Sequence, residues 1–280
     1  MANGPSSLTS LPPGCREDSR DSASGLSRQG PTIKTAMYLM PFIRVKILTV
    51  IEGSCPVDCG LDEAGRGAAI GPLVVACVRA PLGSLAELGV RDSKLLTPRK
   101  REALFEEIGK RAAVRVREIW PDELNALMEE RSLNEIELEA MAGLIRECGC
   151  RRAFVDAVSP DEAEFARRLR EATGVEVIAR HRAESLFDLV AAASIVAKVV
   201  RDRRIREIAS EIGDFGSGYP SDPRTREFLR RYVEEKGSLP PYVRKKWKNV
   251  KRLLAGRELE SFAVREGEAG GGKEDTGREA

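Results

Sequence analysis

Two adjacent acids and a glycine-rich turn are the residues of this sequence best suited to chemistry. Asp62 and Glu63 end the apolar run 57–61, and Gly65-Arg66-Gly67 follows them before a second apolar run, 71–78. Neighbouring carboxylate oxygens at a sheet edge are ligands that Mg²⁺ and Mn²⁺ prefer. Because glycine has no Cβ, the turn also lets a ligand approach the backbone closely. A charged hairpin turn without a ligand is the alternative, since Gly and Asp are common turn residues.

Further acids could join this pair from other parts of the chain. Asp156 ends the apolar run 152–157, so it would meet Asp62 at one sheet edge if the two runs are neighbouring strands. Glu184 and Asp188 lie four residues apart at the start of a long predicted helix, and either could supply a fourth carboxylate. Divalent ions would neutralise such a cluster and could promote phosphodiester hydrolysis. Asp156 could instead cap the helix that follows it.

The elements that must position these acids alternate between strands and helices. The patterns predict strands at 57–61, 71–78, 114–119, 152–157 and 175–179. They predict helices at 97–112, 121–130, 134–148, 184–212, 225–236 and 242–255, and a further helix that opens at 159–162. Hairpin strands come first and crossover connections later, so we expect an α/β fold with a mixed sheet.

Length and composition limit the kind of protein. The chain has 280 residues, enough for one large domain or two small ones. Residues 1–54 lack hydrophobic periodicity over most of their length, and residues 258–280 are charged and glycine-rich, so we expect both to be disordered. The apolar stretch 36–50 is too short and too interrupted to span a bilayer. It also lacks the features of a secretion signal, and we expect a cytoplasmic protein without a membrane anchor.

The histidine and cysteine content argues against several kinds of site. The chain has one histidine, His181, which argues against a histidine metal cluster and against a catalytic triad. His181 could act as a proton shuttle, with an exposed loop position as the alternative. The spacings Cys55-x₃-Cys59 and Cys148-x-Cys150 differ from the usual pairs of zinc sites. We therefore expect buried, reduced thiols, and a disulfide stays open as the alternative.

Six segments together resemble ribonuclease HII, the type 2 ribonuclease H family, in its archaeal branch. They are Leu61–Gly67 with Ile70–Val74, Arg91-Asp92-Ser93-Lys94, Val155-Asp156-Ala157, Ala191–Lys198, Arg201-Asp202-Arg203 and Gly216–Pro223. The resemblance covers about residues 57–254. It implies a ribonuclease H-like core, a five-stranded mixed sheet flanked by helices, with a C-terminal helical extension. The implied division is a catalytic domain at 55–212 and a helical substrate-binding extension at 213–257.

The resemblance also implies an activity. It is the endonucleolytic cleavage of the RNA strand of RNA–DNA hybrids and nicking at ribonucleotides embedded in duplex DNA. Two Mg²⁺ or Mn²⁺ ions would assist the attack of water, and the products would carry 3′-hydroxyl and 5′-phosphate ends. We expect a monomer. A recombinase of similar core fits less well, because the Gly-Arg-Gly turn and Tyr219 suit reading of a 2′-hydroxyl.

Individual residues match the family's site, with one departure. Asp62, Glu63 and Asp156 match three of its four metal-binding acids. The backbone of Gly65, Arg66 and Gly67 falls where the family contacts the 2′-hydroxyl, and Tyr219 where it packs on the adjacent sugar. The fourth acid is an aspartate ten residues before the serine of the Ala-Ala-Ser-Ile run, and here that position is Glu184. This substitution motivates an alternative function, a hybrid-binding protein of the same fold with impaired cleavage.

Basic residues are the remaining candidates for nucleic-acid contacts. Lys94, Lys198 and Arg201 could bind phosphates, and Lys198 needs a partner because it lies on the small-residue face of its helix. A basic run with interleaved aromatic residues resembles a nucleic-acid footprint, and a solvated helix face is the alternative. This run comprises Arg244, Lys245, Lys246, Lys248, Lys251, Arg252 and Arg257.

Overall fold

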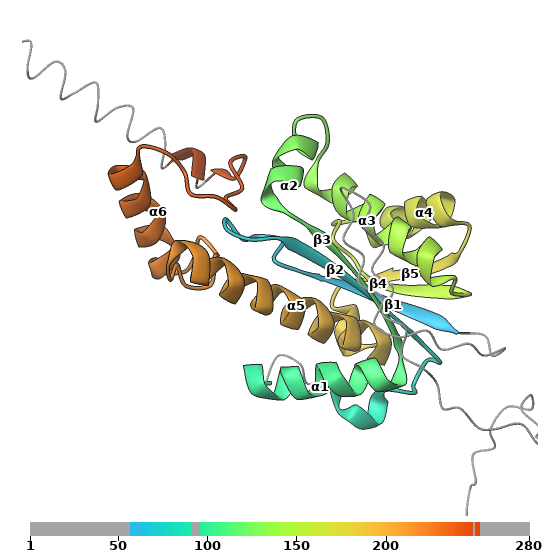
Figure 1. Cartoon of the computed structure of the whole chain (residues 1–280). Coiled ribbons are helices and arrows are strands. Elements are labelled where there is room, and N and C mark those ends of the chain that lie inside the picture. The colour runs from blue at the N-terminus through green and yellow to red at the C-terminus, as the bar shows by residue number, and fades with distance from the viewer. Residues whose placement is uncertain (1–56, 91–95, 249, 253–280) are drawn as a thin grey trace, which may run out of the picture. The chain divides into compact units, whose positions relative to one another are not determined.

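A five-stranded mixed sheet forms the centre of the protein. The computed structural model describes residues 57–90, 96–248 and 250–252 (Figure 1). The sheet has the strand order β3-β2-β1-β4-β5, with β1 antiparallel to β2, β2 antiparallel to β3, and β4 parallel to both β1 and β5. The bounds are β1 (Asp58–Ala64), β2 (Leu73–Ala80), β3 (Ala113–Ile119), β4 (Arg152–Asp156) and β5 (Glu176–Arg180). The predicted fold class, an α/β mixed sheet of five strands, is confirmed.

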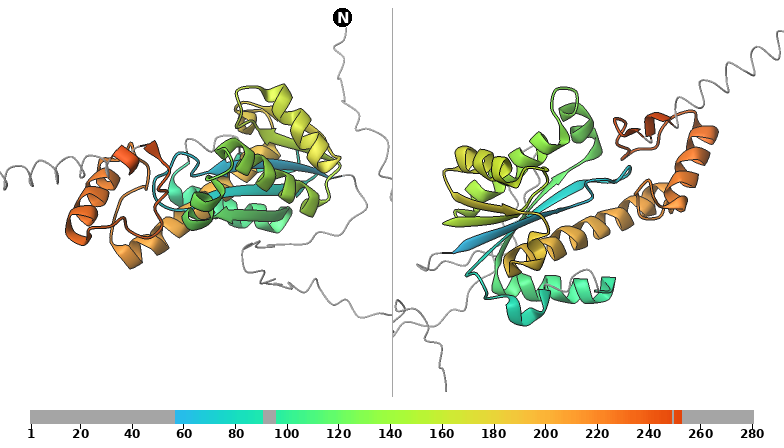
Figure 2. Two further views of the ribbon diagram at one scale, coloured as in Figure 1. Left: turned by 90° about the horizontal axis from the view of Figure 1, so that it is seen from above. Right: turned by 180° about the vertical axis from the view of Figure 1, so that it is seen from behind.

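Helices cover both faces of this sheet (Figures 1 and 2). On one face, α5 (Asp188–Ile212) lies along β1 and β2, with α1 (Pro98–Arg111) beside it. On the other face lie α3 (Leu133–Cys148) and α4 (Glu162–Thr173). The helix α2 (Pro121–Leu127) precedes α3, and α6 (Pro223–Lys236) follows α5. Among the described residues, none of the helices combines the length and the apolar character needed to cross a bilayer.

The close contact of α5 with the sheet depends on small residues. Gly60 lies in the middle of β1, and a Cβ there would come within 2.1 Å of the carbonyl carbon of Leu189. The facing part of α5 is the backbone of Leu189 and Val190, and the fully buried alanines 191–193 follow directly. Because neither side has bulk, the helix backbone approaches β1 directly. This contact sets the distance between β1 and the α5 residues that face its C-terminal end.

Local signals explain several helix ends. The side chain of Thr97 accepts a hydrogen bond from the Lys100 N–H, and Pro98 occupies the first position of α1, as the sequence predicts. Ser132 and Glu135 form a capping box at the start of α3. The side chain of Asp161 caps α4 by accepting from the Glu164 N–H at 2.9 Å. Asp156 therefore does not cap α4, so that alternative is wrong.

The predicted start of the long helix at Glu184 is wrong. Glu184 lies in a separate 3₁₀ turn, η3 (Ala183–Ser185), and α5 begins at Asp188. Arg182, just before η3, has a φ of 57°, which bends the chain sharply there. Glu184 and Asp188 thus belong to different elements and do not share a helix face.

The predicted helix at 242–255 is also corrected. Tyr242 has a φ of 66°, which a right-handed helix does not allow, and Val243 forms a bridge with Ile70. Helix begins only at Lys248 within the described residues. The predicted disordered ends, 1–54 and 258–280, and the segment 91–95 with Lys94 lie outside the described residues.

Candidate active site

The strand β1 continues through both adjacent acids. Asp62 is paired with Ala76 and Glu63 with Val75 on β2. Since side chains alternate across a strand, Asp62 points to the α5 face and Glu63 to the α3 face. Their charges nevertheless act on each other, because the two side chains leave neighbouring backbone positions. The two side chains therefore do not point at one spot.

Asp62 is held by a short chain of hydrogen bonds from α5. Its Oδ1 accepts from the Glu63 N–H at 2.8 Å, and its carboxylate also hydrogen-bonds with the Ser194 side chain. The Nζ of Lys198 donates to the Ser194 Oγ at 2.8 Å, which supplies the partner that the sequence requires for Lys198. Burial raises the pKa of Asp62 to about 7, opposed by Ser194 and reinforced by the charge of Asp156. A nearby cation would favour its ionised form.

Glu63 has a buried oxygen without a donor. Its Oε2 has no hydrogen-bond partner among the described residues. Burial raises the pKa of Glu63 well above its ordinary value, and the charges of Asp62, Glu137 and Asp156 raise it further. An unpaired buried carboxylate oxygen is costly, and a divalent cation would satisfy it. This atom is the observation that best fits a metal at the site.

Asp156 and Glu184 complete the group. Asp156 ends β4, next to β1, and its Oδ1 accepts from the Ala183 N–H at 3.1 Å. That bond attaches η3 to β4 and brings the buried Glu184 into electrostatic contact with Asp156. Burial raises the pKa of Asp156, and the charge of Glu184 raises it further. We call these four residues, Asp62, Glu63, Asp156 and Glu184, the acid cluster.

Asp188 has different surroundings from those of the acid cluster. It is fully buried, and its two oxygens accept from the N–H groups of Gly83 at 3.0 Å and Leu85 at 2.9 Å. It therefore secures the turn after β2 to the start of α5. Of the two candidates for the fourth acid, Glu184 is the one that lies beside Asp156.

The donor set of the acid cluster fits Mg²⁺ or Mn²⁺. It consists of carboxylates, which are hard ligands, and no histidine or cysteine contributes to it. Within the described ranges, the one group of three potential ligand residues whose ligand atoms all lie within 4.8 Å of one another consists of cysteines. The acid-cluster oxygens are therefore more widely spaced. Mutual repulsion accounts for that spacing, and bound cations would offset it.

Gly65 and Gly67 differ in what the fold requires of them. Gly65 has a φ of 86°, and a Cβ there would lie 2.6 Å from Nε of Arg201 and 2.7 Å from the Pro72 carbonyl oxygen. At Gly67 a Cβ would meet nothing within 4 Å. The fold thus demands glycine at 65 but not at 67. The open space at Gly67 leaves its backbone accessible to a ligand.

The side chain of Arg66 is turned away from this opening. Its Nη1 donates to Oε2 of Glu137 at 2.6 Å, and its Nη2 donates to Oδ1 of Asn134 at 2.5 Å. Both partners lie on α3. Glu137 is fully buried, and burial raises its pKa to about 7 although Arg66 opposes the shift. What the loop presents at this position is its backbone.

Two buried arginines, Arg244 and Arg201, stabilise the loop. Arg244 is fully buried, and it donates from Nε to the Gly71 carbonyl at 3.1 Å and from Nη1 to the Arg66 carbonyl at 3.0 Å. Its place in an exposed basic run is therefore wrong. Burial, with the charge of Arg201, lowers the pKa of Arg244 to about 9. Arg201 is also buried and donates to the Ser217 carbonyl at 2.9 Å, so it is not a solvated charge.

Arg201 also brings Tyr219 to the loop. Its guanidinium lies 4.5 Å from the centre of the Tyr219 ring, while its Nε packs against Gly65. The Gly218 carbonyl accepts from the N–H groups of Ala69 at 2.8 Å and Ile70 at 3.1 Å. Tyr219 and the Gly65–Gly67 loop, which are far apart in sequence, therefore lie side by side, as the proposed roles require.

A sequence signal existed for two of the bracing residues. Arg201 follows Ser194 by seven residues, so both lie on one face of α5. Glu137 likewise shares a face of α3 with the buried Met141 and Leu144. A charged residue on the apolar face of a helix indicates that another group inside the protein pairs with it. Arg244 had no comparable signal, because its burial depends on segments far away in the chain.

Other candidates lie outside the acid cluster. His181 is exposed, and its ring contacts the carbonyls of Ala157 at 3.2 Å and Pro160 at 3.3 Å, as expected for a loop histidine. Lys246 pairs with Glu129 at 2.5 Å, whereas Lys245 and Lys248 are exposed.

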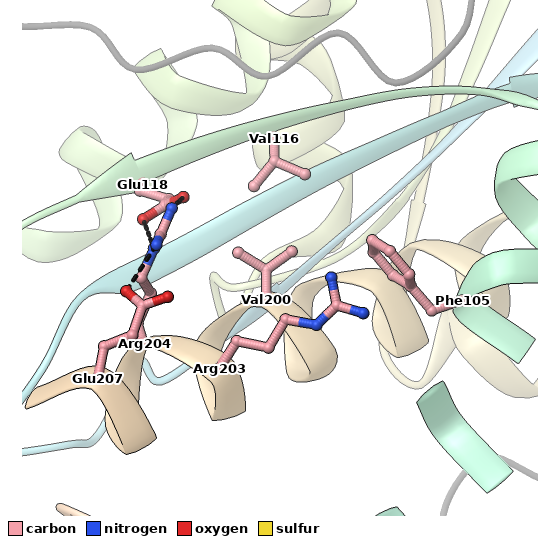
Figure 3. A pocket seen from close by; sticks show the side chains of 7 residues that line it. All are labelled: Phe105, Val116, Glu118, Val200, Arg203, Arg204 and Glu207. Atoms are coloured by element: carbon pink, nitrogen blue, oxygen red, sulfur yellow. Dashed lines mark hydrogen bonds and ion pairs between the residues drawn. The ribbon is translucent and has the colours of Figure 1, made fainter. Parts of the chain in front are cut away.

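A pocket of about 190 Å³ lies between α1, β3 and α5, and it contains none of the acid cluster (Figure 3). Within it, Arg204 pairs with Glu118 at 2.8 Å and with Glu207 at 2.6 Å (Figure 3). Because these charges are paired within the protein, the pocket is not a candidate active site.

Comparison with known proteins gives a consistent answer. The family model for ribonuclease HII matches residues 59–250. The chain is 46% identical over 212 residues to ribonuclease HII of Thermococcus kodakarensis, which covers 73% of this chain and 92% of that protein. It is 45% identical over 198 residues to ribonuclease HII of Archaeoglobus fulgidus, with coverage of 70% and 96%.

Solved structures agree with the sequences. The crystal structure of ribonuclease H2 from Pyrococcus horikoshii OT3 matches with a TM-score of 0.68 and 36% identity, over 72% of this chain and 99% of that one. Ribonuclease HII in the complex with PCNA from Archaeoglobus fulgidus matches with a TM-score of 0.67 and 44% identity, over 70% and 96%. The ribonuclease H-like fold, the predicted resemblance and the enzyme class, a ribonuclease H, are confirmed: the chain belongs to the ribonuclease HII family.

Proposed function

We propose that this protein hydrolyses the RNA strand of RNA–DNA hybrids and nicks duplex DNA at embedded ribonucleotides, leaving 3′-hydroxyl and 5′-phosphate ends. The observation that carries the proposal is the position of the acid cluster. Asp62 and Glu63 near the end of β1, Asp156 at the end of β4 and Glu184 in η3 lie close to a glycine loop whose backbone is open at Gly67. The archaeal relatives named ribonuclease HII support the substrate class.

The acid cluster would hold two Mg²⁺ or Mn²⁺ ions. When bound, such ions activate water and stabilise the leaving oxygen of a phosphodiester. Asp62, Glu63, Asp156 and Glu184 are the residues that would bind them. Asp62 must release its proton as a cation binds, because its pKa of about 7 leaves it partly protonated at neutral pH. The Lys198–Ser194 pair orients the Asp62 carboxylate during this change.

The Gly65–Gly67 loop would recognise the ribose. No acceptor in the described part of the chain takes a hydrogen bond from the backbone N–H of Arg66 or of Gly67. A 2′-hydroxyl is both a donor and an acceptor, so it can use these N–H groups, and a deoxyribose cannot. Tyr219, fixed by Arg201, would pack on the neighbouring sugar. Lys198 lies near Asp62 and would add a positive charge for the substrate backbone.

The alternative function is a hybrid-binding protein with impaired cleavage, because Glu184 carries one more methylene than the family's aspartate. A duplex with one ribonucleotide, incubated with Mg²⁺ or Mn²⁺, distinguishes the two. We expect a single nick at the ribonucleotide, no nick in the all-DNA duplex of the same sequence, and no nick by Asp156→Asn. Tight binding of the ribonucleotide duplex without a nick would support the alternative.

We also propose that the protein acts as a monomer in the cytoplasm, with residues 55–212 as the catalytic domain and 213–257 as a substrate-binding extension. The bracing of the glycine loop by Arg244 and by Gly218 makes the extension part of the site rather than a separate module. Sedimentation with and without a hybrid duplex would measure the oligomeric state.

A further inference from the structure

Four buried cysteines meet on the α3 face of the sheet, away from the acid cluster. Cys59 lies on β1 and Cys77 on β2, while Cys148 and Cys150 flank the end of α3. We call these four residues the thiol cluster. The Sγ atoms of Cys59, Cys77 and Cys148 all lie within 4.8 Å of one another, and Cys148 Sγ is 3.0 Å from Cys77 Sγ. Burial raises the pKa of the Cys59 thiol, and the neighbouring Cys150 thiol raises it further.

The fold brings these thiols together from separate segments. In the β1–β2 register Cys77 is paired with Leu61, so Cys59 is its diagonal neighbour on the same face. Gly149 ends α3 with a φ of 61°, and this left-handed turn places Cys148 and Cys150 at the sheet together. The spacing in sequence could not reveal this group, because its members come from two strands and a helix end.

The surroundings of the thiol cluster suit negative charge. Cys59 is paired across the strands with Arg79, and Cys77 with Arg115. Burial raises the pKa values of the Cys59 and Cys77 thiols, whereas their hydrogen bonds and the charges of Arg115 and Arg79 lower the pKa of Cys148. The Nε of Arg79 is buried without a hydrogen-bond partner among the described residues. Thiolates, rather than thiols, are the form that binds metals.

We propose that Cys59, Cys77 and Cys148, with Cys150 as the fourth ligand, form a structural zinc site. Zn²⁺ takes four ligands in a tetrahedron with Zn–S distances of about 2.3 Å, which requires sulfur atoms about 3.8 Å apart. The Cys77–Cys148 separation is 3.0 Å and no two of the Cys59, Cys77 and Cys148 sulfur atoms are more than 4.8 Å apart, so small side-chain shifts suffice for these three. Each thiol that is protonated beforehand releases one proton to solvent when its Zn–S bond forms.

The site would serve the active site indirectly. It would fasten the end of α3 to β1 and β2, and α3 carries the Glu137 and Asn134 side chains that hold Arg66. The metal would thus stabilise the framework of the glycine loop without touching substrate. Cys148 and Cys150 are each 6% exposed, which places the metal's entry route at the end of α3.

Titration with cobalt and zinc tests the proposal. The full chain is reduced, kept anaerobic, freed of metal and supplied with excess Mg²⁺ to occupy the acid cluster. We expect one equivalent of Co²⁺ to produce sulfur-to-cobalt charge-transfer absorption, and one equivalent of Zn²⁺ to abolish it and to raise the Tm. Cys77→Ala and Cys148→Ala should each weaken Zn²⁺ binding by at least about 100-fold. The matched controls Cys15→Ala and Cys55→Ala, outside the described residues, should bind like the wild type.

Three results would overturn the proposal. They are the absence of thiolate absorption in fully reduced protein, equal absorption in Cys148→Ala, and a Cys77–Cys148 disulfide in protein kept anaerobic throughout. If an alanine variant fails to fold, X-ray absorption at the zinc edge of the wild-type protein decides the question. Four sulfur neighbours at about 2.3 Å are expected, and a shell of oxygen and nitrogen alone would contradict the site.

Discussion

The acid cluster and Asp188 both bury carboxylates against the same sheet, yet their surroundings differ. Asp188 accepts two backbone N–H bonds, and these bonds secure a turn. In the acid cluster, an oxygen of Glu63 has no donor, and the pKa values of Asp62, Glu63 and Asp156 are raised by burial. A buried acid with both oxygens hydrogen-bonded stabilises the fold, whereas a cation would stabilise the ionised form of the acids whose pKa values are raised. Substitutions should therefore cost stability in the first region and activity in the second.

The largest effect is expected at the two acids that end β1 and β4. Asp62→Asn and Asp156→Asn should each lower the nicking rate by about 10³-fold or more, because metal assistance is worth several kcal/mol. Both variants should fold, and removal of acid–acid repulsion should raise their Tm in metal-free buffer. Single-turnover nicking and thermal melts measure the two quantities. Near-normal cleavage by either variant would remove its acid from the metal site.

The next prediction compares Glu184 directly with Asp188. Glu184→Gln should lower the rate by about 10–100-fold, the range seen when supporting groups of metal sites are lost. Glu184→Asp should keep or raise the rate by restoring the shorter reach. Asp188→Asn should leave the rate nearly unchanged but lower the free energy of unfolding by about 1–3 kcal/mol, since one backbone N–H loses its acceptor. An inactive Asp188→Asn beside an active Glu184→Gln would reverse the assignment.

The same contrast explains what could be predicted from the sequence. The strands, α1, α3 and the start of α4 near 159–162 follow from local periodicity and helix-start residues, and the structure confirms them. Asp62, Glu63 and Asp156 stood out because acids end apolar runs. The start of α5 was misplaced, since the bend at Arg182 has no sequence pattern of its own. Such a backbone conformation is set by the tertiary contacts of η3.

The sequence also did not predict which individual charged residues are buried. Arg244 contacts the Gly71 carbonyl across 173 residues of sequence, so its basic neighbours gave no hint of its internal position. Glu137 is buried because Arg66 is held against it, again a long-range pairing. Local sequence patterns indicate which face of a helix is apolar. They do not indicate which charged side chain is buried and paired within the protein.

Gly65 and Gly67 are expected to differ in the same way within one loop. Gly65→Ala should lower the free energy of unfolding by about 1–3 kcal/mol, because its positive φ and its contact with Arg201 leave no room for a Cβ. Gly67→Ala should change stability by less than about 0.5 kcal/mol, yet weaken binding of the ribonucleotide duplex. Urea unfolding and duplex-binding titrations separate the two effects. Equal binding by Gly67→Ala and wild type would mean that the substrate does not approach this backbone.

The pH dependence of stability should reflect the raised pKa of Asp62. The folded chain keeps the Asp62 proton up to about pH 7, whereas an unfolded aspartate releases it near pH 3.9. Between about pH 4 and pH 7 the folded state therefore binds more protons, and metal-free stability should fall as pH rises through this range. Asp62→Asn should show a shallower fall, and excess Mg²⁺ should offset it in the wild type. Urea midpoints at several pH values measure this, and an equal slope in Asp62→Asn would assign the effect to another group.

The smallest effects are expected from the exposed lysines after α6, which contrast with the satisfied Arg244. Lys245→Ala and Lys248→Ala should leave the Tm and the single-turnover rate nearly unchanged, because neither side chain makes a contact that the site uses. Each should make the slope of log K against log salt shallower by up to about 0.9 if it contacts a phosphate. Arg244→Ala should lower the stability and the nicking rate, because its guanidinium donates to the Gly71 and Arg66 carbonyls inside the protein. The salt slope of its remaining hybrid binding should equal that of the wild type. Hybrid binding measured across a range of salt concentrations tests both. An unchanged slope in both Lys245→Ala and Lys248→Ala would show that neither lysine contacts a phosphate.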